Sequence, residues 1–480
     1  MAQLKKPKHR KDNKPWEKGE MPRTSGGKRT DSRPHPAAAA PGRDKTVSRP
    51  RPPAVSNRDK TGSPSRPYPL PRPAAEAKPE ATGYAELVWE ACRAFPKKFL
   101  FDVRSVDPLA DLAYADECLI KQQALEVFWK KHQIPGVPGK IMPSPMPRGY
   151  RTNSKRRVLI YKGKVSLVME QHHCEPGTLQ RSSLEPDMHL SIYQLLLELL
   201  SGVNYQSLAR SLNFCIIRGS YTRCSIILNV FAVDNIIVRK IKQFAATLKA
   251  SDPRILSCFM YVDPTRSDYY LESKRPEKGV AIKKLFGPES LDVTVDGIRL
   301  LYPPTVFSQI NESMLPNFTG AVRDLLELSS GVRLLDLYCG YGMLGLVSAP
   351  HVGSVIGMDI EGPAIHAAIE NAKYHFPGKQ LKFIASPITA DSLCDKLPPP
   401  HPKEVVLLDP PRSGTARGVI HAIAERQPCR VLHIFCGTDE IPRELLEWKA
   451  GGYVPERILP LDMFPGSPNL ETMILLKPCK

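Results

Sequence analysis

The chain has 480 residues, 42% of them hydrophobic, and a formal net charge of +18 at pH 7. This length allows two or three domains with buried cores. No apolar run is long enough to span a membrane, and the N-terminus has no apolar segment of a secretory signal. The 11 cysteines are scattered and odd in number, which favours a reducing compartment over a disulfide framework. We therefore expect a cytoplasmic protein without membrane contacts.

The positive charge is concentrated at the start of the chain. Residues 1–82 hold 20 Lys and Arg against 8 Asp and Glu, which is two thirds of the net charge. This segment is rich in Pro, Arg, Lys, Ser and Ala and cannot bury enough apolar area to offset its ordering entropy, so we predict a disordered tail. Its basic character indicates a polyanionic partner, most simply nucleic acid. A tail that only aids solubility is the alternative.

The sequence pattern of residues 83–302 predicts an α+β domain. Helical spacing predicts helices over residues 84–95 and 114–132, with Leu119, Ala124, Leu125 and Phe128 on one side of the second helix. Strands are expected at 158–161 and 165–169 around a Lys-Gly-Lys turn, and a buried helix at 190–201. Strand, helix and strand should follow between 215 and 262, and then a hairpin over 290–300 with an Asp-Gly turn.

A basic and aromatic stretch precedes the first strands. Arg148, Tyr150, Arg151 and Arg156 interleave side chains that stack on bases with side chains that bind phosphate, so we predict that they contact RNA. A solvated hairpin edge protected by charge would give the same pattern. Further on, His172-His173-Cys174 stands without a second ligand cluster at a usable spacing, and no metal site is expected.

From about residue 306 the pattern alternates between strand and helix, which predicts a doubly wound parallel sheet, a Rossmann-like α/β domain over residues 303–480. A glycine-rich turn follows an apolar strand at 332–335 and precedes a helix, an arrangement that favours a carboxylate or phosphate group. Asp359 ends the next strand, about 20 positions after this turn, where an acidic side chain can bind ribose hydroxyls. The turn alone could be structural, but the pair indicates a nucleoside-type cofactor.

Polar side chains also follow two later strands. Asp409 comes after the strand 405–408 and Cys436 after the strand 431–435, so both should face the same crevice as Asp336. Glu471 precedes the final strand. A cysteine at a strand end is more often a small buried hydrophobe. Beside a methyl-donor site, however, a thiolate can add to carbon 6 of uracil and make carbon 5 nucleophilic, and a carboxylate can then remove the carbon-5 proton.

The chain resembles the S-adenosylmethionine-dependent RNA uracil-C5 methyltransferases, the family that methylates uridines in bacterial tRNA and 23S rRNA. The resemblance runs from about residue 143 to the end and is strongest from 303 on. It rests on four segments in order: Phe307-Ser-Gln309-Ile-Asn311, Asp336 to Gly342, Asp409-Pro-Pro-Arg-Ser-Gly414, and Phe464 to Glu471. It implies a class I methyltransferase domain with S-adenosylmethionine as cofactor, Cys436 as nucleophile and Glu471 as base. It also implies cofactor or base contacts by Gln309, Tyr338, Asp359 and Asp409. Gly340 of the glycine turn is expected to bind the cofactor as well.

The chain departs from this family in several places. The nucleophile loop reads Phe435-Cys436-Gly437-Thr438 instead of Ser-Cys-Asn-Pro, and Asn469 replaces the histidine before the base. Both chemical groups remain, so we expect an active enzyme. Many members carry a four-cysteine iron–sulfur motif. Here Cys92, Cys118 and Cys174 are far apart, and no iron–sulfur cluster is expected.

The sequence thus predicts a monomeric RNA methyltransferase that forms 5-methyluridine in rRNA or tRNA through a covalent Cys–C6 adduct. One alternative is an RNA-binding protein with a catalytically degenerate methyltransferase fold, which the unusual loop after Cys436 favours. Another is methylation of a different position in nucleic acid. Direct amino-group methylation commonly uses an Asn-Pro-Pro-aromatic loop, which Asp409-Pro-Pro-Arg412 does not match.

Overall fold

The computed structural model describes residues 83–96, 103, 105, 107–169, 175–266 and 281–479. The chain divides into two compact units, Met1–Ala75 and Glu76–Lys480, and all described residues belong to the second. The predicted tail over 1–82 lies outside the described residues. Within the described part of the chain, no helix is both long and apolar enough to cross a membrane.

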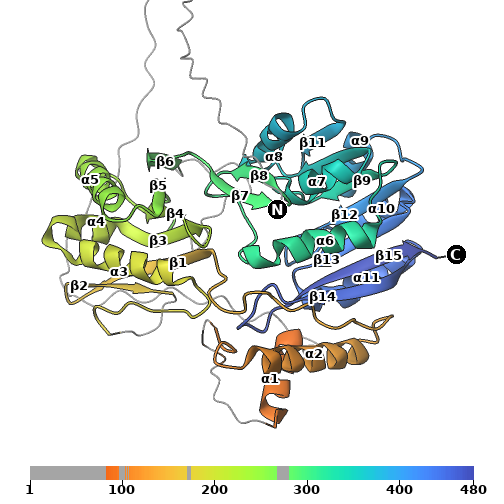
Figure 1. Ribbon diagram of the computed structural model, residues 1–480, viewed down its shortest axis with the longest axis horizontal. Helices are drawn as coiled ribbons and strands as arrows, with labels where there is room; N and C mark the ends of the chain where they lie inside the picture. The colour runs from red at the N-terminus through yellow and green to blue at the C-terminus, as the bar shows by residue number, and fades with distance from the viewer. Residues whose placement is uncertain are drawn as a thin grey trace, which may run out of the picture. The chain divides into compact units, whose positions relative to one another are not determined.

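Two helices open the described chain and confirm the prediction for this region. They are α1 (Tyr84–Ala94) and α2 (Tyr114–Lys131) (Figure 1). Ala124, Leu125 and Phe128 of α2 are buried as predicted, but Leu119 is 55% exposed. Leu119 lies about 2.5 turns before Phe128 and therefore on the opposite side of the helix, which corrects the predicted apolar face.

A first sheet, here called the central sheet, has six strands in the order β2-β1-β3-β4-β5-β6. Helices α3, α4 and α5 share one hydrophobic core with it. Only β4 and β5 run parallel; the other neighbours are antiparallel. The bounds are β1 (Asn153–Tyr161), β2 (Lys164–Val168), α3 (Asp187–Ser201), α4 (Gln206–Ser211), β3 (Leu212–Gly219), β4 (Cys224–Val230), α5 (Asn235–Ser251), β5 (Ile255–Val262) and β6 (Ala281–Phe286).

The predicted order of elements in this sheet was wrong at one place. Between residues 215 and 262 the chain forms two strands, a helix and a strand, because a tight turn separates β3 from β4. In this turn the backbone N–H of Ser220 donates to the carbonyl of Arg223 at 2.8 Å. The apolar runs on either side look like one segment when the turn is missed. The hairpin of β1 and β2 is confirmed, with β1 beginning five residues before the predicted 158.

The second sheet, here called the C-terminal sheet, has seven strands in the order β11-β10-β9-β12-β13-β15-β14. Its strands are β9 (Arg333–Leu337), β10 (Ser354–Asp359), β11 (Leu381–Ala385), β12 (Glu404–Leu408), β13 (Arg430–Phe435), β14 (Tyr453–Leu461) and β15 (Glu471–Pro478). Its helices are α6 (Leu315–Leu326), α7 (Met343–Ser348), α8 (Pro363–His375), α9 (Ala390–Lys396), α10 (Val419–Glu425) and α11 (Ile441–Ala450). Short 3₁₀ helices span Val203–Tyr205, Glu312–Met314, Ala349–His351 and Thr438–Glu440.

The predicted α/β architecture is confirmed, but the C-terminal sheet is mixed rather than wholly parallel. Strands β9 to β13 are parallel, whereas β15 is antiparallel to both β13 and β14. The connection from β14 to β15 contains no crossover helix, and a direct connection between neighbouring strands makes them antiparallel. This reversal brings the first residue of β15 to the edge at which β13 ends.

One hydrophobic core contains residues from both sides of the predicted domain boundary at residue 302. The hairpin of β7 (Leu291–Val295) and β8 (Ile298–Tyr302) shares a core with α6, α7 and one face of the C-terminal sheet. Helices α1 and α2 share a core with α10, α11 and the other face. Alternate residues of β9 divide between these cores, with Leu334 in one and Leu335 in the other, as the pleat requires.

Candidate active site

Three polar side chains meet where β12 and β13 end and β15 begins. Cys436 follows β13, Asp409 follows β12, and Glu471 is the first residue of β15. The Sγ atom of Cys436 lies 3.4 Å from Oδ1 of Asp409 and 3.7 Å from Oε1 of Glu471. Because Phe435 is paired with Thr472 across the antiparallel strands, the next residues along, Cys436 and Glu471, become neighbours. The antiparallel direction of β15 therefore places the Glu471 carboxylate beside the Cys436 thiol.

Burial sets the protonation of this group. It raises the pKa of Glu471 to about 8, with a further contribution from Asp409, and the pKa of Asp409 to about 6. Burial and then these two carboxylates raise the pKa of the Cys436 thiol well above its usual value. At neutral pH the thiol therefore keeps its proton and can donate it toward a carboxylate oxygen. Glu471 is 1% exposed, and its Oε2 atom has no hydrogen-bond partner among the described residues.

The thiol lies in a pocket of about 220 Å³. One wall comes from the loop 436–440 and from Arg412, a second from residues 468–470, and a third from Tyr84 and Ala85 of α1. The backbone N–H of Tyr84 donates to Oδ1 of Asp439 at 2.7 Å, which ties α1 to the loop that carries the thiol. The contribution of α1 could not be expected from the sequence, since more than 300 residues separate it from Cys436.

Side chains of α11 hold the loop after β12 in place. Oε1 of Glu444 accepts hydrogen bonds from the backbone N–H of Thr415 at 2.5 Å and from its hydroxyl at 2.9 Å. Oε2 of Glu444 lies 3.0 Å from Nε2 of His433, and Nδ1 of His433 accepts a bond from Trp448 at 3.1 Å. Gly414, with φ +76°, packs so closely that an added Cβ would lie 2.2 Å from Glu444 Oε1. These contacts fix the loop that presents Asp409.

The glycine turn after β9 forms as predicted. The backbone N–H of Gly340 donates to Oδ2 of Asp359 at 2.7 Å, and that of Gly345 donates to Oδ2 of Asp336 at 2.8 Å. Tyr338 adopts φ +64°, a conformation that is unusual for a side chain with a Cβ. A Cβ added to Gly340 would meet nothing within 4 Å, so open space lies beside the turn.

The segment 307–311 approaches from the connection before α6. Asn311 is fully buried, and its amide nitrogen donates to the Ser144 hydroxyl at 3.0 Å and to the carbonyl of Met463 at 3.3 Å. Asn311 therefore fixes the segment 307–311 to Ser144 and to the loop after β14. Gln309 is 7% exposed, and no hydrogen bond between described residues involves its side chain.

A buried ion cluster anchors the loop that leads to Glu471. Nζ of Lys121 lies 2.8 Å from Oε1 of Glu117 and 2.8 Å from Oδ1 of Asp462, and all three side chains are 0% exposed. Oε1 of Glu117 also accepts the backbone N–H of Gly466 at 2.6 Å, and the hydroxyl of Tyr114 donates to Asp462 at 3.1 Å. This cluster could not be predicted from residue spacing, because a Glu and a Lys four residues apart usually pair on a helix surface.

The predicted RNA contacts fall on mostly enclosed side chains. Tyr150 is 1% exposed and its hydroxyl donates to the carbonyl of Pro465 at 2.9 Å, while the buried Arg156 pairs with Glu185 at 2.7 Å. Arg148 binds backbone carbonyls of the connection before α2 and lies 3.0 Å from Glu117. These positions argue against RNA contacts by Tyr150 and Arg156, and place Arg148 in the anchoring cluster. Arg151 is exposed, and its contact with RNA stays a prediction.

Among the described residues, no group of three or more His, Cys, Asp or Glu side chains is arranged to hold a metal ion. His172, His173 and Cys174 lie outside the described residues. Cys92 and Cys118 belong to α1 and α2. With Cys174 undescribed, the expected lack of an iron–sulfur cluster stays a prediction.

Comparison with known proteins gives this geometry a context. No family model matches the chain. An uncharacterized RNA methyltransferase of Thermosynechococcus vestitus is 33% identical over 186 residues, 38% of this chain and 39% of that protein. A 23S rRNA (uracil(1939)-C(5))-methyltransferase of a Marinomonas species is 33% identical over 180 residues, 38% of this chain and 40% of that protein. The chain thus matches about two fifths of the length of these curated relatives.

A solved structure covers more of the chain. The tRNA (uracil-54, C5)-methyltransferase of Pyrococcus abyssi, in complex with S-adenosyl-L-homocysteine, superposes with a TM-score of 0.57 at 19% identity. The match covers 78% of this chain and 86% of that one, and it shows that the two share a fold. The chain is thus distantly similar in sequence to RNA (uracil-C5)-methyltransferases, and it shares its α/β fold with one whose structure holds S-adenosyl-L-homocysteine.

Proposed function

We propose that this protein transfers a methyl group from S-adenosylmethionine to carbon 5 of a uridine in rRNA or tRNA. The observation that carries the proposal is the position of Cys436, whose thiol lies within 3.7 Å of two carboxylates at the ligand edge of a class I methyltransferase sheet. A thiol and a carboxylate beside one pocket are the two groups that carbon-5 methylation of a pyrimidine requires.

Cys436 acts as the nucleophile in this proposal. Its sulfur forms a bond to carbon 6 of the uracil, and the electron pair of the C5–C6 double bond moves toward carbon 5 and the neighbouring carbonyl. The thiol must lose its proton first, and the closest acceptor is Oδ1 of Asp409 at 3.4 Å. With a pKa raised to about 6 by burial, the Asp409 carboxyl is largely ionised at neutral pH and can take that proton.

Glu471 completes the reaction as the base. Once carbon 5 carries both the new methyl group and its original hydrogen, the carboxylate removes that hydrogen as a proton, the C5–C6 double bond reforms, and the sulfur leaves carbon 6. Burial raises the pKa of Glu471 to about 8, which makes its carboxylate a stronger base than an exposed one. The unpartnered Oε2 atom gives it an oxygen that is not committed to the protein.

The residues around the glycine turn fit S-adenosylmethionine, which supplies an electrophilic methyl group when it is bound. Asp359 ends β10, where its carboxylate can accept hydrogen bonds from ribose hydroxyls. The Gln309 amide, which makes no hydrogen bond to another described residue, can bind a polar group of the cofactor. The open space beside Gly340 lets a ligand approach the backbone, with Tyr338 next to it.

The uracil must leave its stack to reach a thiol that lines a pocket, so the substrate is a loop or a flipped nucleotide. The unusual Gly437 after the nucleophile is compatible with this chemistry. An added Cβ at this position would lie 3.0 Å from the carbonyl oxygen of Arg412. A glycine here permits the close approach of the Cys436 and Asp409 loops.

Purified protein, labelled S-adenosylmethionine and total RNA from cells lacking the gene provide the test, with nucleoside mass spectrometry as the readout. We expect 5-methyluridine with the wild type and none with Cys436→Ala. Fractionation of the RNA by size then separates tRNA from rRNA as substrate. If wild-type protein binds the cofactor but yields no 5-methyluridine in any fraction, the enzymatic proposal fails and the RNA-binding alternative takes its place.

A further inference from the structure

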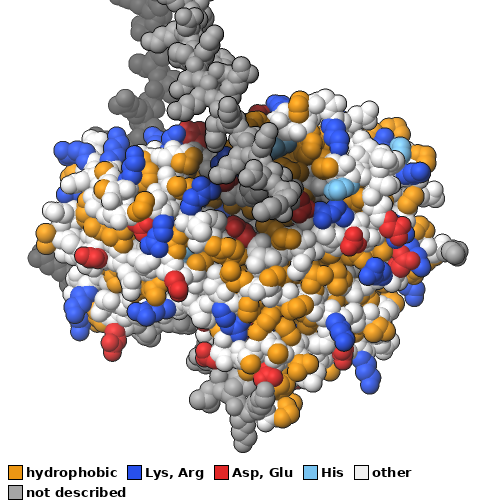
Figure 2. Space-filling view, in the orientation of Figure 1, with side chains coloured by type: hydrophobic (Ala, Val, Ile, Leu, Met, Phe, Trp, Pro, Cys, Tyr) orange, Lys and Arg blue, Asp and Glu red, His pale blue; other side chains and the backbone are white. Residues whose placement is uncertain are grey.

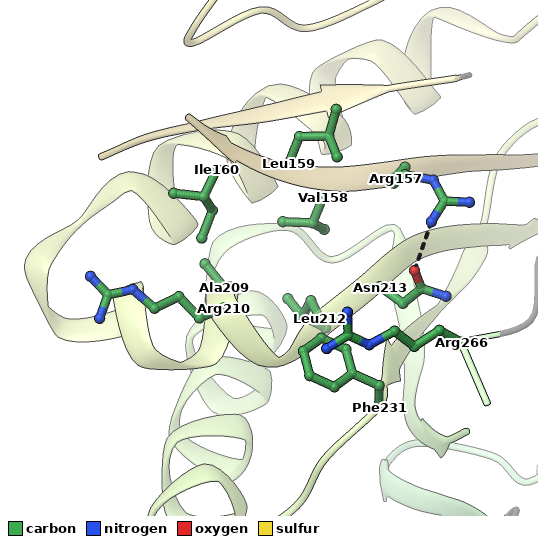
Figure 3. A pocket seen from close by; sticks show the side chains of 10 residues that line it. All are labelled: Arg157, Val158, Leu159, Ile160, Ala209, Arg210, Leu212, Asn213, Phe231 and Arg266. Carbon is green, nitrogen blue, oxygen red and sulfur yellow. Dashed lines mark hydrogen bonds between the residues drawn. The ribbon is translucent and has the colours of Figure 1, made fainter. Parts of the chain in front are cut away.

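A second pocket, of about 330 Å³, lies entirely on the central sheet and its helices. It shares no lining residue with the pocket around Cys436. Three arginines line it: Arg157 from β1, Arg210 from α4 and Arg266 from the segment after β5 (Figure 3). The other described lining residues are Val158, Leu159, Ile160, Ala209, Leu212, Asn213 and Phe231, and none of these described residues is acidic.

Aromatic rings and an amide orient two of these guanidinium groups. The Arg266 guanidinium carbon lies 3.6 Å from the centre of the Phe231 ring, and Figure 3 shows the two groups stacked. Arg157 lies 4.4 Å above the Phe214 ring, and its Nη1 donates to Oδ1 of Asn213 at 3.0 Å. Stacking on a ring holds a guanidinium in place without cancelling its charge, and for the exposed Arg266 it leaves N–H groups that an anion can reach.

The backbone of β1 adds a second feature. Strand β1 pairs with β3 only from Asn153 to Arg157, whereas its pairing with β2 continues to Tyr161. The edge of residues 158–160 that points toward β3 therefore has no strand partner among the described residues, and these three residues line the pocket. Backbone N–H groups beside arginines are a common way for proteins to contact phosphate oxygens.

Positive charge alone does not distinguish this pocket from other parts of the surface. On the face drawn in Figure 2, Lys and Arg side chains are mixed with Asp and Glu side chains. Many arginines of the chain are paired with carboxylates, for example Arg254 with Asp252, Arg426 with Glu404 and Arg443 with Glu440. By contrast, no ion pair between described residues involves Arg210 or Arg266, and both side chains are exposed.

We propose that this pocket binds backbone phosphates of the RNA substrate at a point separate from the target uridine. The inference rests on the proposed function, which makes RNA the partner. Arg210 and Arg266 lie at separate points of the rim of a partly apolar pocket, which matches a phosphate-sugar strand that crosses the central sheet, with the Arg266–Phe231 stack as a surface for a base or a sugar. The site anchors the RNA and takes no part in the chemistry.

The full-length protein carrying R157Q, R210Q and R266Q tests this proposal. The matched control carries R239Q, K242Q and K249Q, which remove the same charge from exposed positions of α5. A double variant with R210Q and R266Q keeps the Arg157–Phe214 stack in place, in case the triple variant folds poorly. The probes are fluorescein-labelled bulk tRNA and rRNA fragments, with affinity measured from 50 to 200 mM salt and 5-methyluridine formation measured in parallel.

We expect the triple variant to bind RNA about 10-fold more weakly and to lower the slope of log affinity against log salt by about 2, as the loss of two to three phosphate contacts requires. The KM for RNA should rise while kcat at saturating RNA stays within about twofold, and the α5 control should match the wild type. Equal weakening by the control, or unchanged affinity in both pocket variants of a methylating enzyme, would overturn the assignment. So would loss of binding to phosphatidylserine vesicles with unchanged affinity for RNA. A wild type that makes no 5-methyluridine yet binds RNA through this pocket would instead reject only the enzymatic proposal.

Discussion

The ammonium group of Lys121 lies 2.8 Å from Oδ1 of Asp462, and neither side chain has any exposed surface. The bond joins α2 to the loop between β14 and β15, across more than 300 residues of chain. This loop ends at Glu471, so an ion cluster near the start of the described chain fixes the approach to the proposed base. Helices α1 and α2 are therefore part of the active-site architecture.

Removal of this ammonium group should destabilise the protein strongly. Lys121→Met leaves the carboxylates of Glu117 and Asp462 buried without their shared cation, and the expected cost is about 3–5 kcal/mol of unfolding free energy. Urea unfolding measures it. Lys130→Met, at an exposed position of the same helix, is the control and should change stability by less than about 0.5 kcal/mol. Equal stability of the two variants would show that the cluster does not anchor the loop.

The loop that presents Asp409 should be sensitive to a single methyl group. Gly414→Ala places a Cβ 2.2 Å from Glu444 Oε1 at φ +76°, so the loop must move. Gly163 has the same φ of +76° and nothing within 4 Å of an added Cβ, which makes Gly163→Ala a control for backbone strain alone. We expect both variants to lose about 1 kcal/mol for the positive φ. Gly414→Ala alone should also slow methylation, by up to about 10²-fold. Equal rates in the two variants would contradict the proposed role of the Glu444 contact.

The pH dependence of activity should report Glu471. Its carboxyl, with a pKa raised to about 8 by burial and Asp409, must be ionised before it can accept the carbon-5 proton. The Cys436 thiol also has a raised pKa, so its thiolate becomes more available in the same direction. We predict that kcat/KM for methyl transfer rises from pH 6 through pH 8 and does not fall before pH 9. A maximum near pH 6 would exclude Glu471 as the base.

Ionisation of the Glu471 carboxyl should also make stability depend on pH. Stability should fall as the pH rises, whereas activity should increase. Since folding raises the pKa of this carboxyl from 4.5 to about 8, it favours the folded state below the unfolded pKa, and that contribution is lost as the pH rises through 8. Glu471→Gln cannot ionise, so its melting temperature relative to the wild type should be higher at pH 9 than at pH 5. Asp336, whose pKa burial also raises to about 8, is common to both proteins and cancels in the comparison. A difference that does not vary with pH would show that Glu471 is not protonated in the fold.

Much of the C-terminal sheet follows from local sequence. Apolar runs that end in Asp336, Asp359, Asp409 and Cys436 are read as strands, and parallel strands in alternation with helices bring such ends to one edge. The glycine turn is also local, because Gly340 and Gly342 adopt positive φ values that favour glycine. The strands, the turn and the edge at which these polar side chains meet could therefore be predicted from residue types alone.

Features that depend on pairing between distant parts of the chain could not be predicted from the sequence. The antiparallel direction of β15 is set by its connection to β14, and the meeting of Glu471 with Cys436 depends on it. On β1, which arginine points inward depends on the register with β3: Arg156 lies on the face packed against α3, and Arg157 on the other. Spacing gave both residues the same appearance, so the prediction selected the buried Arg156 for RNA, whereas Arg157 lines the basic pocket.

The central claim is a covalent bond between Cys436 and carbon 6 of a uridine. In Glu471→Gln the bond can form and the methyl group can be transferred, but no carboxylate removes the carbon-5 proton, so the adduct should persist. Incubation of this variant with S-adenosylmethionine and unmodified substrate RNA, followed by nuclease digestion and mass spectrometry, should reveal a peptide containing Cys436 with a methylated uridine attached. The variant that also carries Cys436→Ala should show none. An adduct on another residue, or 5-methyluridine formed at the wild-type rate without Cys436, would contradict the account.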